Sequence, residues 1–263
     1  MNKKISIVMA YHNRKSQLLF TLKTIEKSLH KNIEIIIVDD NSNKDHQLDD
    51  VVAKYSFPIK YIKFNRTNER SMNPCVVYNK GFKEASGDIV IIQNPECCHI
   101  GDVIKYINDN LKINEFYSFS CVNLNYEELN NKFYKNCNEG TELNFIDSLP
   151  DIACIKWYNH PKYRPAGYHF LSAINKSDLD KLKGFDERYE FGSGYDDVEF
   201  VERVKYNNIT FKIIDPTNNP FAVHQWHKKT KLFDAKLADI NRLIFHDHMK
   251  ELGIVQYNKN PEI

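Results

Sequence analysis

Short apolar segments alternate with segments at helical spacing through the first hundred residues. Residues 5–10, 33–38 and 89–92 are nearly continuous apolar runs, and residues 59–64 alternate between apolar and polar. Such runs are typical of parallel strands that are buried on both faces. Residues 18–29 and 76–85 carry apolar side chains at helical spacing. This order of strands and helices predicts an α/β fold with a mixed, mostly parallel sheet flanked by helices.

The second half of the chain is less regular. We expect helices over residues 103–111, 177–182, 198–204 and 233–252, strands over 116–122 and 211–214, and a loop over the polar, asparagine-rich residues 123–145. The chain shows no internal repeat and no low-complexity linker. The simplest organisation is therefore one continuous domain over residues 1–230, followed by a helical tail over residues 231–263.

Polar clusters follow each of the four N-terminal strands that the pattern predicts. They cover residues 11–14, 39–42, 65–70 and 94–96. In an open parallel sheet, the carboxyl ends of the strands converge on the crevice where ligands bind. We therefore expect one binding site at this edge of the sheet, built mainly from residues 3–100.

Two of these clusters contain carboxylates with chemistry suited to a nucleotide. In Asp39-Asp40-Asn41-Ser42, a carboxylate can accept a hydrogen bond from the imide N–H of uracil or from a ribose hydroxyl. In Asn94-Pro95-Glu96, one carboxylate can hold a divalent cation against a diphosphate. The alternative for both clusters is a turn or a helix cap, roles that these residue types also favour.

A second acidic cluster lies late in the chain, where Gly192 and Gly194 precede Asp196-Asp197. Glycine lets the backbone approach a ligand closely, and a carboxylate at a helix start can take a proton from a hydroxyl group. The alternative is a capped helix start. Nearby, Val223-His224-Gln225-Trp226-His227 offers two imidazoles. Residues three apart on a strand point to different faces, so the two histidines need not share a metal.

An aromatic and polar segment lies between these clusters. It contains Trp157, Tyr158, His160, Tyr163, Tyr168 and His169. Aromatic faces pack on sugar rings, while hydroxyl and imidazole groups bond to sugar hydroxyls. Ordinary core packing is the alternative.

Composition excludes some functions and leaves others open. The net charge of +1 gives no field that would attract nucleic acid or an anionic membrane. Six cysteines without metal-site spacing are expected to be free thiols. The apolar run at the start is too short for a secretory signal, and no stretch approaches the ~20 apolar residues of a membrane span. These features together predict a cytoplasmic protein without a transmembrane segment.

The order of these motifs resembles the family 2 glycosyltransferases, which have the Rossmann-like GT-A fold. The resemblance runs from Ile5 to His227. It rests on the opening strand with Tyr11-His12-Asn13-Arg14, on Val38–Ser42, on Arg70, Asn79 and Gly81, on Lys183-Gly184-Phe185-Asp186-Glu187, and on Gly194–Phe200 with Arg203. The last segment is also similar to a galactosyltransferase segment. The implied organisation is a nucleotide-binding part at 1–100, a part at 101–230 with catalytic residues and acceptor-side loops, and a C-terminal helix.

The resemblance implies an inverting transferase that moves a sugar from a UDP-sugar to a hydroxyl of a glycan, lipid or protein. It assigns the nucleotide to Ala10, Tyr11, Arg14, Asp39, Asp40, Arg70, Asn79 and Asn94, catalysis to Asp197 as base with Asp196, and the acceptor or sugar to Trp157, His169, Gly194 and Tyr195. The family usually has Asp-x-Asp where this chain has Asn94-Pro95-Glu96. A manganese or magnesium ion would then be held by Glu96 with His224 or, as second choice, His227.

Two other classes of function compete with this interpretation. A nucleotide-dependent oxidoreductase needs a glycine-rich turn after the first strand, and Ala10–Arg14 contains no glycine. A nucleotide-sugar or glycan-binding module that has lost catalysis would fit the missing Asp-x-Asp acid, but the intact Asp196-Asp197 pair argues against it.

Overall fold

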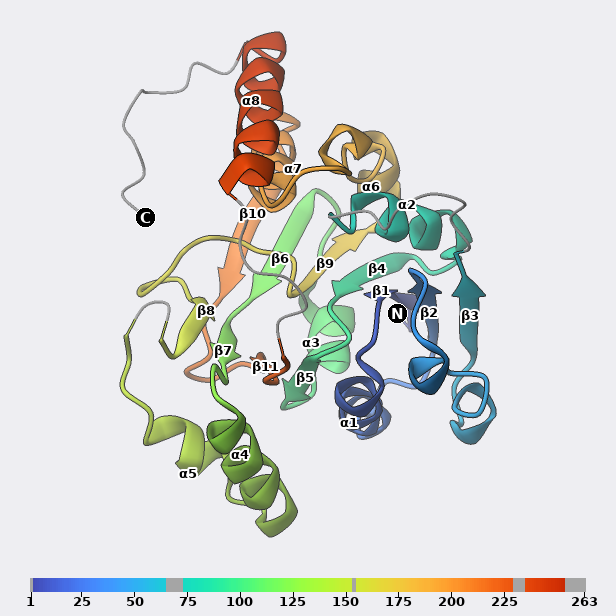
Figure 1. Cartoon of the computed structure of the whole chain (residues 1–263), viewed down its shortest axis with the longest axis vertical. Coiled ribbons are helices and arrows are strands. Elements are labelled where there is room, and N and C mark those ends of the chain that lie inside the picture. Colours follow the sequence, from blue (N-terminus) through green and yellow to red (C-terminus); the bar gives the residue numbers. More distant parts are fainter. Residues whose placement is uncertain (1, 65–72, 153–154, 229–234, 254–263) are drawn as a thin grey trace.

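The computed structural model describes residues 2–64, 73–152, 155–228 and 235–253. Its central element is a seven-stranded sheet in the order β10-β6-β9-β4-β1-β2-β3 (Figure 1). The strands are β1 (Ile5–Tyr11), β2 (Ile33–Asp39), β3 (Ile59–Lys63), β4 (Ile89–Gln93), β6 (Glu115–Phe119), β9 (Leu171–Asn175) and β10 (Thr210–Ile214). All pairings in this sheet are parallel except those of β9, which runs against β4 and β6. The α/β fold with a mostly parallel sheet is therefore confirmed.

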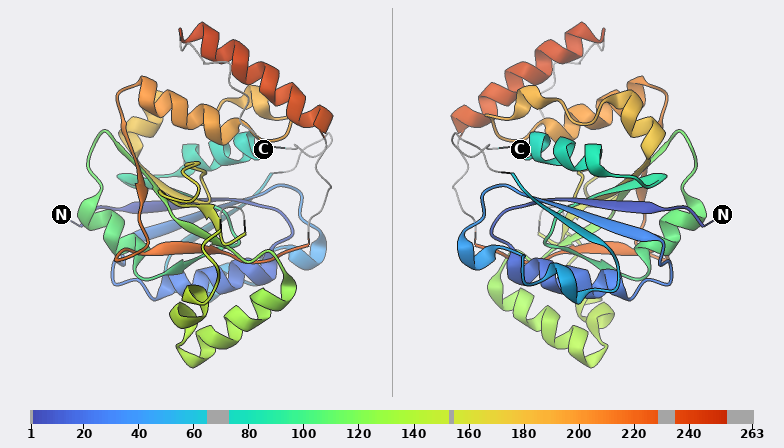
Figure 2. Two further views of the ribbon diagram at one scale, coloured as in Figure 1. Left: turned by 90° about the vertical axis from the view of Figure 1, so that its left-hand side faces the viewer. Right: turned by 90° about the vertical axis from the view of Figure 1, so that its right-hand side faces the viewer.

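Helices cover both faces of this sheet, which explains why its central strands are apolar at nearly every position. The helices α1 (Lys15–Glu26) and α3 (Val103–Asn110) pack with Ile5, Ile7 and Met9 of β1. On the opposite face, Val8 packs in a core that includes α2 (Cys75–Glu84), α6 (Lys176–Leu182) and α7 (Asp196–Tyr206). Figure 2 shows the sheet between these two helical layers.

A smaller sheet lies beside the first, with the order β5-β11-β7-β8. Its strands are β5 (Cys97–Ile100), β7 (Cys121–Asn123), β8 (Trp157–Asn159) and β11 (Phe221–His224). The strand expected over residues 116–122 is in fact two strands, because the chain leaves the large sheet after Phe119 and enters the small one at Cys121. The strand β5 begins directly after Glu96 and pairs with β11, so this sheet joins the two halves of the chain.

The loop expected over residues 123–145 was wrong, since this segment forms α4 (Glu127–Glu139) and begins α5 (Glu142–Asp147). Only Asn130 and Phe133 of α4 are buried. The rest of the helix faces solvent, which explains its polar composition. Leu129, Phe133 and Cys137 recur at i, i+4 and pack in a third apolar cluster, which was the signal for a helix.

Short 3₁₀ turns η1 (Lys44–His46), η2 (Val52–Lys54) and η3 (Glu187–Tyr189) complete the described elements together with the long helix α8 (Ala235–Glu251). No helix in these described ranges is long and apolar enough to span a membrane. The five cysteines within them are free, while Cys154 lies outside the described residues.

The close packing of α2 on the sheet depends on Gly81. A Cβ atom at this position would lie 2.4 Å from Cγ1 of Val8 and 3.3 Å from Cγ2 of Val38, two fully buried strand side chains. We expect Gly81→Ala to lower the free energy of unfolding by about 1–2 kcal/mol, because overpacking outweighs the gain in helix propensity. Urea unfolding measures this change, with Lys80→Ala on the same helix as the control. Equal or greater stability in Gly81→Ala would contradict the packing argument.

Candidate functional site

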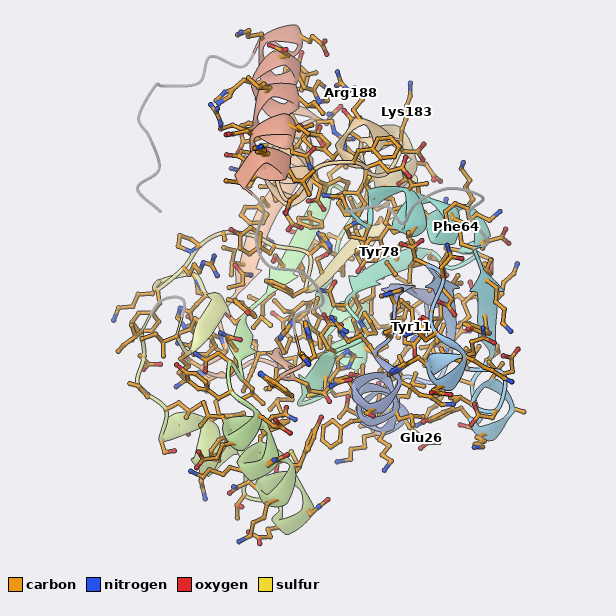
Figure 3. The ribbon with its side chains drawn as sticks, in the orientation of Figure 1. Tyr11, Glu26, Phe64, Tyr78, Lys183 and Arg188 are labelled. Carbon is orange, nitrogen blue, oxygen red and sulfur yellow. The ribbon has the colours of Figure 1, made fainter. Side chains whose placement is uncertain are left out.

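The carboxyl ends of the first strands are aligned by their register. Tyr11 of β1 lies opposite Asp39 of β2, and Asp39 lies opposite Lys63 of β3. A pocket opens at this edge between the α1 and α2 layers, and Figure 3 labels Tyr11 and Tyr78 from its lining. The lining residues are Ala10, Tyr11, His12, Arg14, Asp40, Pro74, Val77, Tyr78, Asn94, Pro95 and Glu96. Three of the four polar clusters expected at one edge therefore meet in one pocket, while residues 65–70 lie outside the described residues.

The two adjacent acids after β2 have different environments. Asp39 accepts hydrogen bonds from the backbone N–H of Ser42 at 2.8 Å and from the hydroxyl of Tyr61, so its carboxylate fixes the turn. Asn41 takes the left-handed conformation in this turn, with φ of 56°. Asp40 bonds through its backbone N–H to the carbonyl of Tyr11, and it lines the pocket. Between these two acids, Asp40 is therefore the one placed to meet a ligand.

The loop after β1 is held against the loop after β2. The imidazole Nδ1 of His12 lies 2.7 Å from the carbonyl oxygen of Asp40, and the backbone N–H of Asn13 donates to Oγ of Ser42 at 3.0 Å. Arg14 donates to the carbonyl of Asn13 and lines the pocket. A cationic and an anionic side chain thus border the same cavity.

The polar cluster after β4 forms the other wall of the pocket. The hydroxyl of Tyr78 donates to Oδ1 of Asn94 at 2.8 Å and to the carbonyl of Gln93 at 3.1 Å. This contact fixes the Asn94 side chain and leaves the ring of Tyr78 along the cavity. Tyr78 was not among the residues predicted from the sequence, although an aromatic residue with a polar tip near the start of a helix was the available signal.

Glu96 lies beside both late histidines. Its Oε1 is 3.4 Å from Nε2 of His224 and 3.5 Å from Nε2 of His227, and all three side chains are largely buried. Burial alone raises the pKa of Glu96, but bonds and charges from the two histidines hold this pKa well below its usual range. One carboxylate and two imidazoles whose ligand atoms lie within 4.8 Å of one another fit a divalent transition-metal ion.

The two histidines converge because β11 ends at His224. The alternation of faces along a strand therefore does not apply to His227, and both imidazoles, which need not have shared a metal, lie beside Glu96. Gln225 lies between them and is fully buried. Its side-chain N–H₂ donates to the carbonyl of Glu96 at 3.0 Å and to Oγ1 of Thr21 at 3.0 Å, and its Oε1 accepts from Tyr134 at 2.6 Å. These bonds fix the segment between the two imidazoles.

The two acids at the start of α7 also differ. Asp196 is 4% exposed and accepts a hydrogen bond from Nδ2 of Asn73 at 2.7 Å. The Asp197 side chain is 21% exposed, contacts Nδ1 of His169 and accepts from the backbone N–H of His169 at 3.2 Å. Burial lowers the pKa of His169, against the opposing fields of Asp196 and Glu96. The ring of His169 thus lies beside a carboxylate that solvent can reach.

His169 and Phe170 connect this acid pair to the pocket. The ring of His169 meets the ring of Tyr78 edge-on, with centroids 5.1 Å apart. The next residue, Phe170, meets the ring of His224 at 5.7 Å, and its carbonyl accepts from the backbone N–H of Asn94 at 3.1 Å. The histidine–glutamate cluster and Asp197 are therefore close to the same pocket.

Asn79, expected to contact the nucleotide, is instead a structural residue. Its amide bonds to the backbone N–H and carbonyl of Phe185 at 2.8 Å each and to Oε1 of Glu187 at 3.0 Å. A Cβ at Gly184 would lie 2.3 Å from Oδ1 of Asn79, which explains the glycine there. Asn79 thus fastens α2 to the segment before α7, away from the pocket lining.

Two other expected residues, Trp157 and Tyr195, do not line the pocket. Trp157 is 4% exposed, packs in the third apolar cluster and donates to Asp151 at 3.0 Å, so a sugar has no access to its ring. The Tyr195 ring lies against Phe245 of α8, with centroids 5.6 Å apart. Gly194 has a left-handed φ of 69° and open space at its Cα. Arg70 lies outside the described residues.

Two protein-family models match the chain. The model described as glycosyl transferase family 2 matches residues 6–170, and the model described as the N-terminal domain of galactosyltransferase matches residues 154–228. The first match contains the whole pocket lining and His169, and the second contains the acid pair and both late histidines.

Characterised and uncharacterised relatives match about half of the chain or less. The chain is 30% identical over 112 residues to a dolichol-phosphate mannosyltransferase of Pyrococcus furiosus, covering 41% of this chain and 30% of that protein. It is 30% identical over 129 residues to an uncharacterized glycosyltransferase of Rickettsia conorii, covering 49% of this chain and 20% of that protein. The chain thus spans less than a third of the length of these relatives.

Solved glycosyltransferases share the fold over most of the chain. The structure of S. aureus TarS 1–349 with UDP-GlcNAc matches with a TM-score of 0.63 at 13% identity, covering 94% of this chain and 66% of that one. A mannosyltransferase from Pyrobaculum calidifontis in complex with GDP-Man and Mn²⁺ matches with a TM-score of 0.52 at 13% identity, covering 87% and 58%. The fold is therefore that of the GT-A glycosyltransferases. Because the first family model covers more than half of the 263 residues, the chain belongs to glycosyl transferase family 2.

Proposed function

We propose that this glycosyltransferase is an inverting enzyme that moves a hexosyl or N-acetylhexosaminyl group from a UDP-sugar to a hydroxyl of a glycan, lipid or protein. The observation that carries the proposal is the convergence of three groups on one pocket. Asp40 lines the pocket at the end of β2, and Glu96 lines it beside His224 and His227. Asp197 contacts His169, whose ring meets the ring of Tyr78 in the pocket lining.

The nucleotide end of the pocket suits uracil. Asp40 lines the cavity, and a carboxylate there can accept the imide N–H of the base. Arg14 and the backbone around Ala10 and Tyr11 border the same space and can contact the base or ribose. Asp39 supports this end indirectly, because both of its carboxylate oxygens hold the turn that presents Asp40.

The other end suits a diphosphate with a divalent cation, manganese or magnesium. Glu96, His224 and His227 would hold the ion, and the mixed oxygen and nitrogen ligands favour manganese over magnesium. When bound, the ion would offset the charge that builds on the leaving diphosphate. Tyr78 and Asn94 fix the adjoining wall, so the donor would be oriented by side chains that are already hydrogen-bonded.

Asp197 is the proposed general base. Its carboxylate would take the proton of the acceptor hydroxyl while that oxygen bonds to the anomeric carbon and the bond to UDP breaks. The partial exposure of Asp197 lets an acceptor reach it, whereas Asp196 is buried and bound to Asn73. One base and one stabilised leaving group suffice for a single displacement, which inverts the anomeric centre.

A panel of nucleotide sugars tests this function. The protein is mixed with UDP-, GDP- and dTDP-linked sugars, with and without Mn²⁺, and release of the nucleotide is followed. We expect slow release of UDP to water with Mn²⁺, because many such enzymes lose some donor to hydrolysis. Consumption of a GDP-sugar alone would overturn the UDP assignment, and binding without any turnover would favour a sugar-binding module.

The uracil contact gives a separate prediction. Asp40→Ala should weaken UDP binding by about 1–3 kcal/mol, because the polar edge of uracil would be buried without a hydrogen-bond partner. Titration calorimetry measures the affinity, with Asp147→Ala on the exposed end of α5 as the control. Unchanged UDP affinity in Asp40→Ala would refute the role of Asp40.

A further inference from the structure

The helix α8 lies outside both segments that match family models, since these end at residues 170 and 228. It nevertheless lies against the layer that contains α7 (Figures 1 and 2). Its buried residues are Asn241, Phe245 and Met249, which recur at i, i+4 and i+8 and so form one face. This face packs on the segment that carries the two acids, residues 187–199, rather than on the donor pocket.

Asn241 makes the central contact. It is fully buried, and its side-chain N–H₂ donates to the carbonyl of Tyr189 at 3.1 Å and to the carbonyl of Gly194 at 2.8 Å. These carbonyls lie at the two ends of the loop that leads into Asp196 and Asp197. The carbonyl of Tyr189 also accepts from the backbone N–H of Gly192 at 3.2 Å, and that of Gly194 from Nδ2 of Asn73 at 3.5 Å. Asn241 is thus the one side chain of α8 that bonds to both ends of the loop, and it does so from a buried position where hydrogen bonds are costly to lose.

The loop has no room to move toward α8. A Cβ at Gly192 would lie 2.0 Å from Oδ1 of Asn241 and 2.8 Å from the carbonyl oxygen of Leu237. The next residue, Ser193, donates its backbone N–H to that same carbonyl of Leu237 at 3.0 Å. The approach of this helix thus requires glycine at position 192.

The residue before the acid pair is held in an unfavourable conformation. Tyr195 has a φ of 67°, in the left-handed region that aromatic residues rarely adopt. Such a conformation persists only where surrounding contacts fix it. Here the Tyr195 ring packs on Phe245 of α8, and the preceding carbonyl of Gly194 is bound by Asn241. The helix α8 thus contacts both the ring of the strained residue and the carbonyl that precedes it.

A second group of contacts lies about two to three turns beyond Asn241 along α8. His248 Nδ1 lies 3.1 Å from Oε1 of Glu199 on α7 and 3.3 Å from Oδ2 of Asp186. Arg188, labelled in Figure 3 beside α8, pairs with Glu251 at 3.3 Å. Glu199 is itself fully buried and paired with Arg203. The helix is therefore attached to the acid-bearing segment at both of its ends.

We propose that α8 is a positioning element for the general base, with Asn241 as its principal residue. Asn241 touches neither donor nor acceptor; it fixes the loop over residues 189–195 so that α7 begins at Asp196 and presents Asp197 beside His169. This inference rests on the proposed role of Asp197. It assigns to the C-terminal helix a role in the chemical step, separate from donor binding by the N-terminal half.

The first test is Asn241→Ala in the full chain, with Arg242→Ala on the exposed side of the same helix as the control. We expect kcat for UDP-sugar turnover to fall on the order of 10- to 100-fold, since small displacements of a catalytic group have effects of this size. The KM for the donor and the affinity for UDP should stay within about twofold of the wild type. Wild-type kcat in a folded Asn241→Ala protein would overturn the proposal, as would a KM effect without a kcat effect.

Hydrogen exchange gives a readout that does not need activity. In Asn241→Ala, peptides covering residues 189–197 should exchange on the order of tenfold faster, while peptides covering β1 and β2 should not change. Unchanged exchange over residues 189–197 would overturn the proposal even if the wild type turned over no donor. A different failure is also recognisable. If Asp197→Asn kept wild-type turnover, the assignment of Asp197 as base would fail, while faster exchange in Asn241→Ala would still show that Asn241 holds the loop.

Gly192→Ala approaches the same contact from the loop side, in case Asn241→Ala does not fold. It should lower kcat in the same way, because the added methyl group pushes the loop from α8. In the double variant, the Asn241 amide atoms closest to the added methyl group are gone. The combined loss of kcat should therefore be clearly smaller than the product of the two single losses. Strictly multiplicative effects on kcat would show that the two positions act independently and would overturn the proposal.

Discussion

Asp197→Asn should lower turnover of the donor by about 10²- to 10⁴-fold and leave UDP affinity unchanged. Asparagine has nearly the same shape and can keep the contact with the backbone N–H of His169, so the loop should stay in place. It cannot take a proton from the acceptor hydroxyl, so the loss should fall on kcat. Nucleotide release measures turnover, and titration calorimetry measures the affinity for UDP.

Glu202→Gln is the matched control for this variant. Glu202 lies on the same helix, pairs with Lys205 at 2.8 Å on the exposed side, and loses its charge in the same way. It should keep turnover within about twofold, since exposed ion pairs contribute little to stability. Turnover at the wild-type level in Asp197→Asn would remove Asp197 as the base. A loss of UDP affinity in that variant would show that the change reaches the donor pocket.

Glu96→Gln should reduce the affinity for Mn²⁺ at least about 100-fold and reduce turnover with it. The variant keeps the size of the side chain but removes the only carboxylate of the cluster with His224 and His227. Electron paramagnetic resonance of free Mn²⁺ measures binding without any reference to turnover. Glu128→Gln, on the exposed face of α4, is the control because it changes the same charge far from the pocket.

Full activity in excess chelator, together with unchanged Mn²⁺ binding in Glu96→Gln, would contradict a cation site at this cluster. The diphosphate would then have to be neutralised by cationic side chains alone, of which Arg14 lines the pocket. Loss of Mn²⁺ binding without loss of turnover would separate the site from the reaction and leave it a structural feature.

The N-terminal fold could be predicted because each strand of the sheet core is buried on both faces. Runs such as Ile33–Val38 are apolar at every position but one, so the sequence shows both the strand and the polar residues that end it. The strand β9 was missed because Leu171-Ser172-Ala173-Ile174 follows an aromatic segment without a turn signal between them. The helix α4 was missed because it buries only a narrow face.

The candidate site was predicted where it depends on strand ends and missed where it depends on contacts distant in sequence. Asp40 and Glu96 follow strands whose register brings them together. The contacts of Asn79 with Phe185 and of Asn241 with Gly194 cross 106 and 47 positions of sequence, and no local pattern reveals them. The two histidines meet Glu96 because a buried glutamine fixes the segment between them, which spacing alone does not show.

The most direct measurement follows UDP-sugars by proton NMR with Mn²⁺, comparing the wild-type protein with Asp197→Asn at equal UDP saturation. The wild type should consume at least one UDP-sugar and release UDP, and Asp197→Asn should consume it at least about 100-fold more slowly. Equal consumption by both proteins, or no consumption of any UDP-sugar by the wild type with or without a hydroxyl acceptor, would contradict the account.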